Sequence, residues 1–137
     1  MSAENLHVGV IGATGAVGVE LINVMFDRNF PVGELTLFAS ERSAGKTMET
    51  KYGTKTIALF SVEEAKQCDI VFLAVSGEFA KEFAPQIAKG ALVIDNSSAF
   101  RMDDDVPLIV PEINGALAKT AKLIANPNCT TAIAAVA

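Results

Sequence analysis

The fold of this chain is decided by the segment Leu6-His7-Val8-Gly9-Val10-Ile11 and its continuation, Gly12-Ala13-Thr14-Gly15-Ala16-Val17-Gly18. The first part is a short apolar run, which predicts a buried strand that ends at the glycines. Helical periodicity then follows from Val19 to Phe26. A strand, a glycine-rich loop and a helix in this order are typical of dinucleotide-binding domains, in which the phosphates lie at the N-terminus of the helix.

The three glycines of this loop have separate expected roles. Gly12 allows the tight turn, Gly15 lets the pyrophosphate approach the backbone, and Gly18 lets the helix pack closely against the strand. Their spacing is G-x-x-G-x-x-G, which matches the general fingerprint G-x-G-x-x-G only in part. A tight turn between strand and helix, with no ligand, is the alternative interpretation of the same residues.

Strands and helices alternate along the rest of the chain. Further strands are expected at residues 34–39, 69–75, 91–95 and 122–125, with an extended segment at 107–110 and a β-hairpin over residues 46–60. Helices are expected at 77–89, where Pro85 favours a kink, at 113–120 and from residue 130, and a short one begins at Ser61. This order predicts an α/β fold, a doubly wound, Rossmann-like parallel sheet with helices on both faces.

Composition narrows the class of protein. The chain has 137 residues, of which 50% are hydrophobic and 20% charged, so residues 1–137 suffice for one globular domain with a sizeable core. A net charge of -5 argues against nucleic-acid or anionic-membrane partners, and no apolar run approaches the roughly 20 residues of a membrane-spanning helix. With no signal peptide, two cysteines and one histidine, we expect a cytoplasmic domain without a disulfide framework or a metal site.

The residues after the second strand bear on the choice between NAD and NADP. An NAD-specific site usually places an acidic residue there, which holds the ribose 2′-hydroxyl. In this chain the strand is followed by Ser40-Glu41-Arg42-Ser43, where Arg42 and the two serine hydroxyls suit a 2′-phosphate and Glu41 is expected to point away. The segment favours NADP, and a solvated polar loop is the alternative.

Cys129 stands at a proline-bounded turn, Asn126-Pro127-Asn128-Cys129, directly before a helix expected from Thr130. Backbone N–H groups and the helix dipole at such a position favour the nucleophilic thiolate and stabilise an oxyanion. The alternative is a buried structural cysteine. The other cysteine, Cys68, precedes a buried strand and is expected in the core, and His7 lies too far along the chain to be a good candidate for the base.

Arg101 lies in a long loop expected from Asn96 to Asp105, in the segment Asn96-Ser97-Ser98-Ala99-Phe100-Arg101 that follows another strand. Ligands of open α/β sheets collect at the carboxyl ends of strands, where an arginine suits a phosphate or a carboxylate. A surface salt bridge is the commoner use of an arginine. The segment Pro111-Glu112-Ile113-Asn114 is expected to shape a turn and start a helix rather than to line a site.

Together these segments make the chain resemble the N-terminal, nucleotide-binding part of aspartate-β-semialdehyde dehydrogenases. The matching pieces are residues 12–18, 40–45, 95–101, 111–114 and 126–131, in family order across essentially the whole chain. The resemblance implies that NADP is bound by Gly12, Ala13, Thr14, Gly15, Ala16, Val17, Ser40, Arg42, Ser43 and Ser76. It also implies that Arg101 binds the substrate phosphate and that Cys129, with Asn128 beside it, is the catalytic nucleophile.

The resemblance further implies an activity in the biosynthesis of lysine, threonine and methionine. This is the NADPH-dependent reduction of β-aspartyl phosphate to aspartate semialdehyde, with release of phosphate through a cysteine thioester. The N-acetyl-γ-glutamyl-phosphate reductases are similar, but they carry a glycine immediately before the cysteine, where this chain has Asn128.

Family members continue into a second domain that carries the histidine base and most of the dimer interface. We therefore expect this chain to be a fragment of a homo-oligomeric enzyme, inactive on its own. A nucleotide-binding module without turnover is one alternative, and a protein that keeps the fold only as a scaffold for interactions is another.

Overall fold

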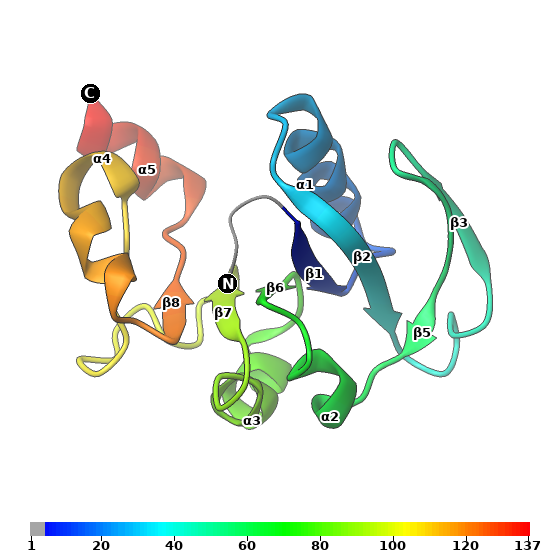
Figure 1. Ribbon diagram of the computed structural model, residues 1–137. Helices are drawn as coiled ribbons and strands as arrows, with labels where there is room; N and C mark the ends of the chain where they lie inside the picture. The colour runs from blue at the N-terminus through cyan, green and yellow to red at the C-terminus, as the bar shows by residue number, and fades with distance from the viewer. Residues whose placement is uncertain (1–4) are drawn as a thin grey trace.

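The computed structural model describes residues 5–137. A six-stranded sheet lies at its centre, in the order β5-β2-β1-β6-β7-β8, and every neighbouring pair of strands is parallel (Figure 1). The strands are β1 (Leu6–Ile11), β2 (Val32–Ala39), β5 (Ala58–Leu59), β6 (Ile70–Leu73), β7 (Leu92–Asp95) and β8 (Leu123–Ala125). The chain builds the sheet outward from β1 in one direction and then outward from β6 in the other. This is the doubly wound order, with its switch point between β1 and β6.

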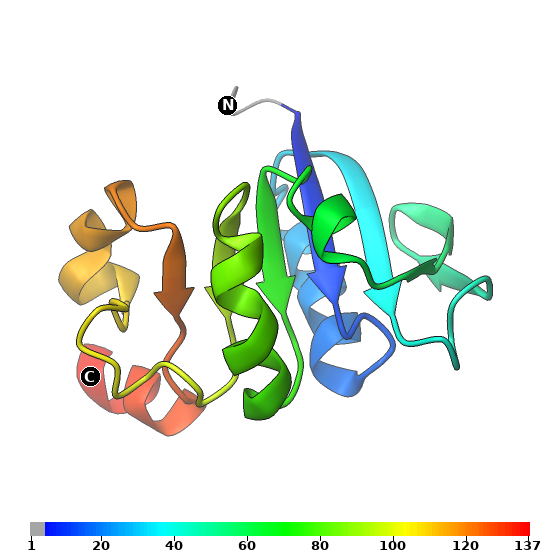
Figure 2. The same cartoon turned by 90° about the horizontal axis from the view of Figure 1, so that it is seen from below.

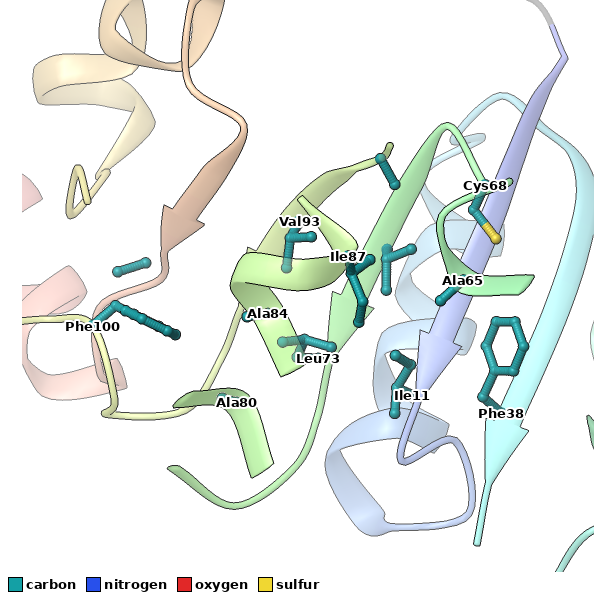
Figure 3. Packing of buried hydrophobic residues seen from close by; sticks show 13 residues of the cluster. Ile11, Phe38, Ala65, Cys68, Leu73, Ala80, Ala84, Ile87, Val93 and Phe100 are labelled. Atoms are coloured by element: carbon teal, nitrogen blue, oxygen red, sulfur yellow. The ribbon is translucent and has the colours of Figure 1, made fainter. Parts of the chain in front are cut away.

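Helices cover both faces of this sheet (Figures 1 and 2). α1 (Ala16–Asp27) packs on one face, and α2 (Val62–Ala65) and α3 (Gly77–Ile87) pack on the other. Side chains of β1 point alternately to the two faces, so that Val8 and Val10 pack with Ile22 of α1. Ile11 packs instead with Ala84 of α3 (Figure 3). The expected α/β, doubly wound fold is confirmed.

The segment between β2 and β5 differs from the expected long hairpin. Only β3 (Thr47–Thr50) and β4 (Gly53–Thr56) pair as an antiparallel hairpin. Ala58 and Leu59 leave it and pair in parallel with Phe38 and Ala39 of β2, so a hairpin over all of residues 46–60 is wrong at its C-terminal end. The reason is Ile57, which is 4% exposed: its burial in the core beside α1 brings the next residues to the edge of β2.

The hairpin is attached to α1 by an aromatic contact and an ion pair. The rings of Tyr52 and Phe26 meet edge to face, with their centroids 5.2 Å apart. Lys51 Nζ lies 2.6 Å from the Asp27 carboxylate, an exposed pair that contributes little to stability. The hairpin takes the place of the helix that would connect the second and third strands of a βαβαβ unit.

The helix expected at residues 113–120 begins earlier and is divided. α4 (Pro111–Asn114) is followed by a 3-10 helix, η1 (Gly115–Lys119). Pro111 suits the first helical position because its φ is already fixed near the helical value. The Asn114 side chain bonds back to the preceding segment, accepting from the Val110 N–H at 2.8 Å and donating to the Leu108 carbonyl at 2.8 Å. Leu108 pairs with Ala125, which confirms the extended segment expected at 107–110.

The remaining helices agree with the sequence apart from their ends. α3 runs through Pro85 to Ile87 without interruption. α5 (Cys129–Val136) begins at Cys129, one residue earlier than expected. No helix within residues 5–137 is long and apolar enough to cross a membrane.

Candidate functional site

The residues predicted to bind or react follow the carboxyl ends of the parallel strands. These ends meet at one edge of the sheet, toward which the arrowheads point in Figure 2. The glycine loop follows β1, Ser40 follows β2, Ser76 comes shortly after β6, and the loops 96–101 and 126–128 follow β7 and β8. Open α/β sheets bind their ligands at this edge, so the structure brings the predicted residues to the expected side of the molecule.

The three glycines of the loop differ in whether the fold has room for a Cβ at their positions. Gly12 has a φ of +84°, and a Cβ at this position would overlap the carbonyl oxygen of Ala74. A Cβ on Gly18 would overlap the carbonyl oxygen of Gly12. A Cβ on Gly15 would lie 3.5 Å from that same oxygen, which is an ordinary contact. The fold therefore needs Gly12 and Gly18, whereas a Cβ at position 15 meets only an ordinary contact within residues 5–137.

The N-terminus of α1 is free of side-chain caps. Gly15 occupies the N-cap position, and no side chain of residues 5–137 caps the first-turn N–H groups. By contrast, Ser76 Oγ accepts from the Phe79 N–H at the start of α3. Unpaired N–H groups and the helix dipole make the start of α1 suited to an anion such as phosphate.

A cleft of about 560 Å³, here called the β2 cleft, opens beside the glycine loop. Its polar lining comes from Thr14, Ser40, Glu41 and Ser76. Its apolar lining includes Leu59, Phe60, Phe79 and Phe83, and the Phe60 ring centroid lies 4.9 Å from that of Phe79 and 5.1 Å from that of Phe83. A flat aromatic ligand would meet an apolar wall here, with hydroxyl groups at its rim.

The turn after β2 is closed by backbone hydrogen bonds. The Ser40 carbonyl accepts from the N–H groups of Ser43 and Ala44, at 2.9 and 3.0 Å. Glu41 and Arg42 are both exposed in this turn, and Glu41 is among the residues that line the β2 cleft, whereas Arg42 is not. The expected directions of the two side chains stay predictions.

A second cleft of about 560 Å³, here called the β7 cleft, lies on the α1 side of the sheet. Its walls are the helix residues Ala16, Val17, Glu20, Leu21 and Val24 and the strand residues Phe72, Leu73, Ala74 and Ile94. Asn96 and Asn126 line it at the carboxyl edge. The N-terminus of α1 thus stands between the two clefts, since Thr14 borders one and Ala16 the other. Ala13 between them is fully buried, so the structure leaves no surface of this residue open to a ligand.

Arg101 is tied to the turn that precedes Cys129. Its Nε donates to the Asn126 carbonyl at 2.9 Å, and its Nη2 donates to the Asn96 carbonyl at 3.2 Å. The side chains of Asn96 and Asn126 are themselves joined by a hydrogen bond of 2.8 Å. Both partners of Arg101 are neutral carbonyls, so its positive charge is not neutralised by them.

Cys129 is the first residue of α5, and it is exposed. The Asn128 side chain caps this helix by accepting from the Thr131 N–H at 2.7 Å. The alternative of a buried structural cysteine therefore applies to Cys68 and not to Cys129. Burial, with the Glu34 and Asp69 carboxylates as smaller causes, raises the pKa of the Cys68 thiol to about 12.

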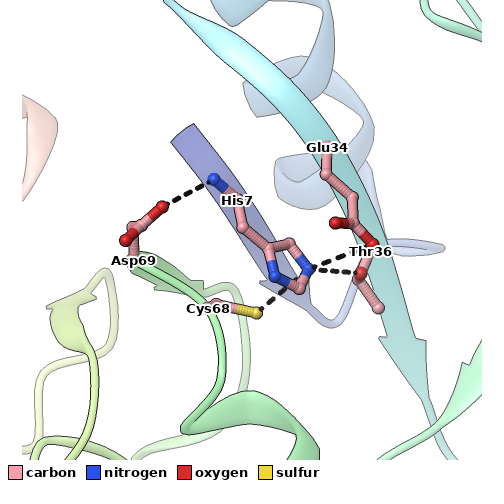
Figure 4. A network of polar contacts seen from close by, with 5 residues as sticks. All are labelled: His7, Glu34, Thr36, Cys68 and Asp69. Carbon is pink, nitrogen blue, oxygen red and sulfur yellow. Dashed lines mark hydrogen bonds and ion pairs between the residues drawn. The ribbon is translucent and has the colours of Figure 1, made fainter. Parts of the chain in front are cut away.

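His7 belongs to the opposite edge of the sheet, near the start of β1. Its Nε2 lies 2.8 Å from Thr36 Oγ1 and 3.6 Å from Cys68 Sγ, while its backbone N–H donates to the Asp69 carboxylate (Figure 4). Cys129 follows the carboxyl end of β8, at the other edge. The structure therefore agrees with the expectation that His7 does not serve Cys129 as a base.

Two residues of the site were not singled out from the sequence as site residues, namely Asn96 and Asn126. Each one directly follows the last residue of a strand, β7 and β8. Because neighbouring parallel strands end at the same edge, this shared position is the signal that would have placed the two amides side by side.

Comparison with known proteins gives consistent matches. A family model described as "Semialdehyde dehydrogenase, NAD binding domain" matches residues 7–121. An aspartate-semialdehyde dehydrogenase of Synechocystis sp. is 48% identical over 134 residues, covering 96% of this chain and 40% of that protein. A structure of aspartate semialdehyde dehydrogenase II from Vibrio cholerae, complexed with ASA, has a TM-score of 0.85 at 43% identity and covers 96% of this chain and 44% of that one.

A structure of the Candida albicans aspartate semialdehyde dehydrogenase with NADP has a TM-score of 0.68 at 25% identity and covers 93% of this chain and 44% of that one. The chain spans about 40% of the length of the curated relatives it matches. The family model, which matches residues 7–121, describes an NAD-binding domain. On this sequence match, and with the doubly wound sheet and glycine loop that it requires, the chain belongs to the semialdehyde dehydrogenase NAD-binding domain family.

Proposed function

We propose that this chain is the nucleotide-binding, nucleophile-bearing part of an aspartate-β-semialdehyde dehydrogenase, which reduces β-aspartyl phosphate with NADPH. The observation that carries the proposal is the bond from Arg101 to the Asn126 carbonyl, because it joins a guanidinium to the turn that ends at Cys129. An acyl phosphate needs a nucleophile for its carbonyl carbon and a cation for its phosphate. One edge of the sheet offers both.

The covalent step follows from these residue types. The Cys129 thiolate attacks the acyl carbon of β-aspartyl phosphate, the bond from that carbon to the phosphate oxygen breaks, and phosphate leaves with the electron pair. A thioester on Cys129 results. The N–H groups in the first turn of α5 stabilise the oxyanion that forms during the attack, and Arg101 balances the charge of the leaving phosphate. Asn128 keeps the first turn of α5 in place through its bond to the Thr131 N–H.

The residues present fit an NADP cofactor. The uncapped start of α1 suits the pyrophosphate, with Gly12, Ala13, Thr14, Gly15, Ala16 and Val17 around it, and the free space at Gly15 suits its close approach. The β2 cleft suits the adenosine, with Ser76 on its wall, and the β7 cleft suits the nicotinamide end. Ser40, Arg42 and Ser43 would hold the 2′-phosphate, which favours NADP over NAD. When bound, NADPH supplies the hydride that reduces the thioester.

Acylation of the chain tests this function without requiring turnover. Incubation with freshly prepared β-aspartyl phosphate should add one aspartyl group to Cys129, as peptide mapping by mass spectrometry would reveal. Cys129→Ser should abolish the thioester, whereas Cys68→Ala should leave it unchanged. N-Acetyl-γ-glutamyl phosphate, the substrate of the related reductases, should not acylate the chain. Acylation by that compound alone, or of Cys68 instead of Cys129, would contradict the proposal.

A nucleotide-binding module without turnover is the second candidate, and the position of His7 favours it. The chain has one histidine, and it lies at the edge of the sheet opposite Cys129. A complete enzyme would need a base from outside this chain.

The further domain, the homo-oligomeric state and the cytoplasmic location expected from the sequence stay predictions. The apolar side chains of Ile113, Leu117 and Ile133, on α4, η1 and α5, are exposed. They offer a surface on which a further domain or a second subunit could pack.

A further inference from the structure

Asp95, the last residue of β7, is a fully buried carboxylate at the edge of the candidate site. Both of its carboxylate oxygens are bonded to Ser97: Oδ1 accepts from the Ser97 N–H at 2.9 Å, and Oδ2 accepts from the Ser97 hydroxyl at 2.7 Å. None of the ion pairs in residues 5–137 involves Asp95. A buried charge without a cation is costly unless hydrogen bonds satisfy it, so the bonds to Ser97 are the ones that hold it there.

The peptide group between Asn96 and Ser97 connects this carboxylate to Arg101. In a trans peptide the N–H and the carbonyl point in opposite directions. The Ser97 N–H points to the Asp95 carboxylate, and the Asn96 carbonyl of the same peptide therefore points away from it, to Arg101 Nη2 at 3.2 Å. Asp95 and Arg101 thus lie on opposite sides of one peptide group, which the carboxylate holds in orientation.

A second connection reaches the other nitrogen of Arg101. The backbone carbonyl of Asp95 accepts from the Asn126 N–H at 2.8 Å. The Asn126 carbonyl in turn accepts from Arg101 Nε at 2.9 Å. The Asn126 carbonyl therefore belongs to a residue that bonds to the Asp95 backbone, and the Asn96 carbonyl belongs to the peptide group whose N–H bonds to the Asp95 carboxylate.

The two bonds leave part of the guanidinium free for a ligand. A guanidinium has five N–H donors in a rigid plane, so the bonds through Nε and Nη2 set the direction of the others. We propose that Asp95 and Ser97 are positioning residues, which hold Arg101 in the orientation that receives the phosphate of the substrate. This inference rests on the proposed function, in which Arg101 binds that phosphate.

The neighbouring serine provides a matched control. Ser97 is 8% exposed, and its hydroxyl both donates to Asp95 and accepts from the Ala99 N–H at 3.1 Å. Ser98 is exposed and lies in the same loop. Ser97→Ala removes the bonds of the hydroxyl, while Ser98→Ala makes the same chemical change without them.

Arginine-labelled NMR and titration with inorganic phosphate test the proposal on the chain itself. In Ser97→Ala, exchange of the Arg101 Nε proton with water should become about tenfold faster and phosphate should bind about tenfold more weakly, as expected for the loss of a bond to a charged group. Ser98→Ala should change neither value. Asp95→Asn should fall between Ser97→Ala and the unaltered chain, because an amide oxygen still accepts from the Ser97 N–H. The dissociation constant of NADP should stay the same in all three variants.

Unchanged proton exchange and unchanged phosphate binding in Ser97→Ala would overturn the proposal. Equal losses in Ser97→Ala and Ser98→Ala would overturn it as well, because they would indicate a general loosening of the loop. Failure of the proposed function appears elsewhere, as absence of Cys129 acylation in the unaltered chain. Proton exchange at Arg101 requires no substrate and therefore decides the positioning role separately.

Discussion

Glu41 and Arg42 are adjacent in one turn and carry opposite charges, so the preference for NADP or NAD depends on which of them meets the ribose. Glu41 is among the residues that line the β2 cleft, and a carboxylate suits a ribose 2′-hydroxyl, whereas a 2′-phosphate suits a guanidinium. The turn is closed by backbone bonds to the Ser40 carbonyl, so both side chains project from a fixed base. We expect the orientation of these two exposed side chains to decide the nucleotide specificity.

Replacing Arg42 tests this balance. Arg42→Ala should weaken NADP binding by about 1.5–3 kcal/mol, the contribution of hydrogen bonds to a charged group, and should change NAD binding much less. Isothermal titration calorimetry with both nucleotides measures the difference. Arg28→Ala serves as the control, because Arg28 is also exposed but follows α1 at the far end of that helix. Equal losses for NADP and NAD would remove Arg42 from the 2′-phosphate site.

The thiol of Cys68 should make the fold sensitive to alkali. Its pKa is raised by burial from 9.0 to about 12, so the unfolded chain loses this proton at a lower pH than the folded chain. The contribution of the Cys68 thiol to the free energy of unfolding is therefore fully present below pH 9, and it is lost as the pH rises toward 12. At pH 10 the thiol should account for a loss of about 1.4 kcal/mol relative to pH 7, since one pKa unit corresponds to that energy.

Comparison with Cys68→Ala isolates this effect from other titrating groups. The variant has a constant cost from the smaller side chain, but it lacks the thiol. Urea unfolding at pH 7 and pH 10 should show that the stability difference between the two proteins shrinks by about 1.4 kcal/mol in favour of the variant. A difference that stays constant with pH would mean that the thiol ionises equally easily in both states.

Two substitutions in the glycine loop test nucleotide binding and folding separately. Gly15→Val should abolish nucleotide binding and keep the far-ultraviolet circular dichroism near native, because its Cβ meets only an ordinary contact within the protein. Gly18→Val should unfold or strongly destabilise the domain, because its Cβ would overlap the Gly12 carbonyl. Thermal unfolding and fluorescence titration with NADPH give the two readouts. Normal binding by Gly15→Val would exclude this loop from the site.

The elements that could be predicted are those that local sequence decides. The apolar run of β1, the glycines after it and the periodicity of α1 are all contained in neighbouring residues, as is the proline-bounded start of α5. The ends of the hairpin could not be predicted, because they depend on the burial of Ile57 in a core built by distant segments. The break after α4 likewise depends on bonds from Asn114 back to Leu108 and Val110.

In the candidate site, too, some features follow from neighbouring residues and others from segments far apart in the sequence. Cys129 and Arg101 were predicted because each stands in a recognisable local context. The pair Asn96 and Asn126 is separated by 30 residues, so its hydrogen bond follows from the strand order and not from any spacing. Local sequence indicated the candidate residues Cys129 and Arg101, and the sheet topology determined which side chains lie beside them.

The sheet of this domain separates Cys129, the proposed nucleophile, from the single histidine of the chain. We predict that the chain as given binds NADP but does not turn over. A general base typically contributes ~10²–10⁴-fold, and the histidine at the opposite edge cannot supply it. A spectrophotometric assay with aspartate semialdehyde, NADP and phosphate should show no reduction of NADP above background at any concentration of the chain. His7→Gln should leave this result and NADP binding unchanged. A turnover rate near the ~10 s⁻¹ of an ordinary enzyme would refute the prediction.

The contact between the hairpin and α1 has an optical consequence. Tyr52 is the single tyrosine of a chain without tryptophan, and its ring packs edge to face on Phe26. Burial and the nearby Asp27 carboxylate raise the pKa of its phenol, so the emitting neutral form persists into alkaline solution. The tyrosine emission of the protein therefore reports the surroundings of a single ring, that of Tyr52. Unfolding followed by tyrosine emission records the detachment of the hairpin, whereas circular dichroism records the loss of the sheet, and the gap between the two midpoints measures how independently the hairpin moves.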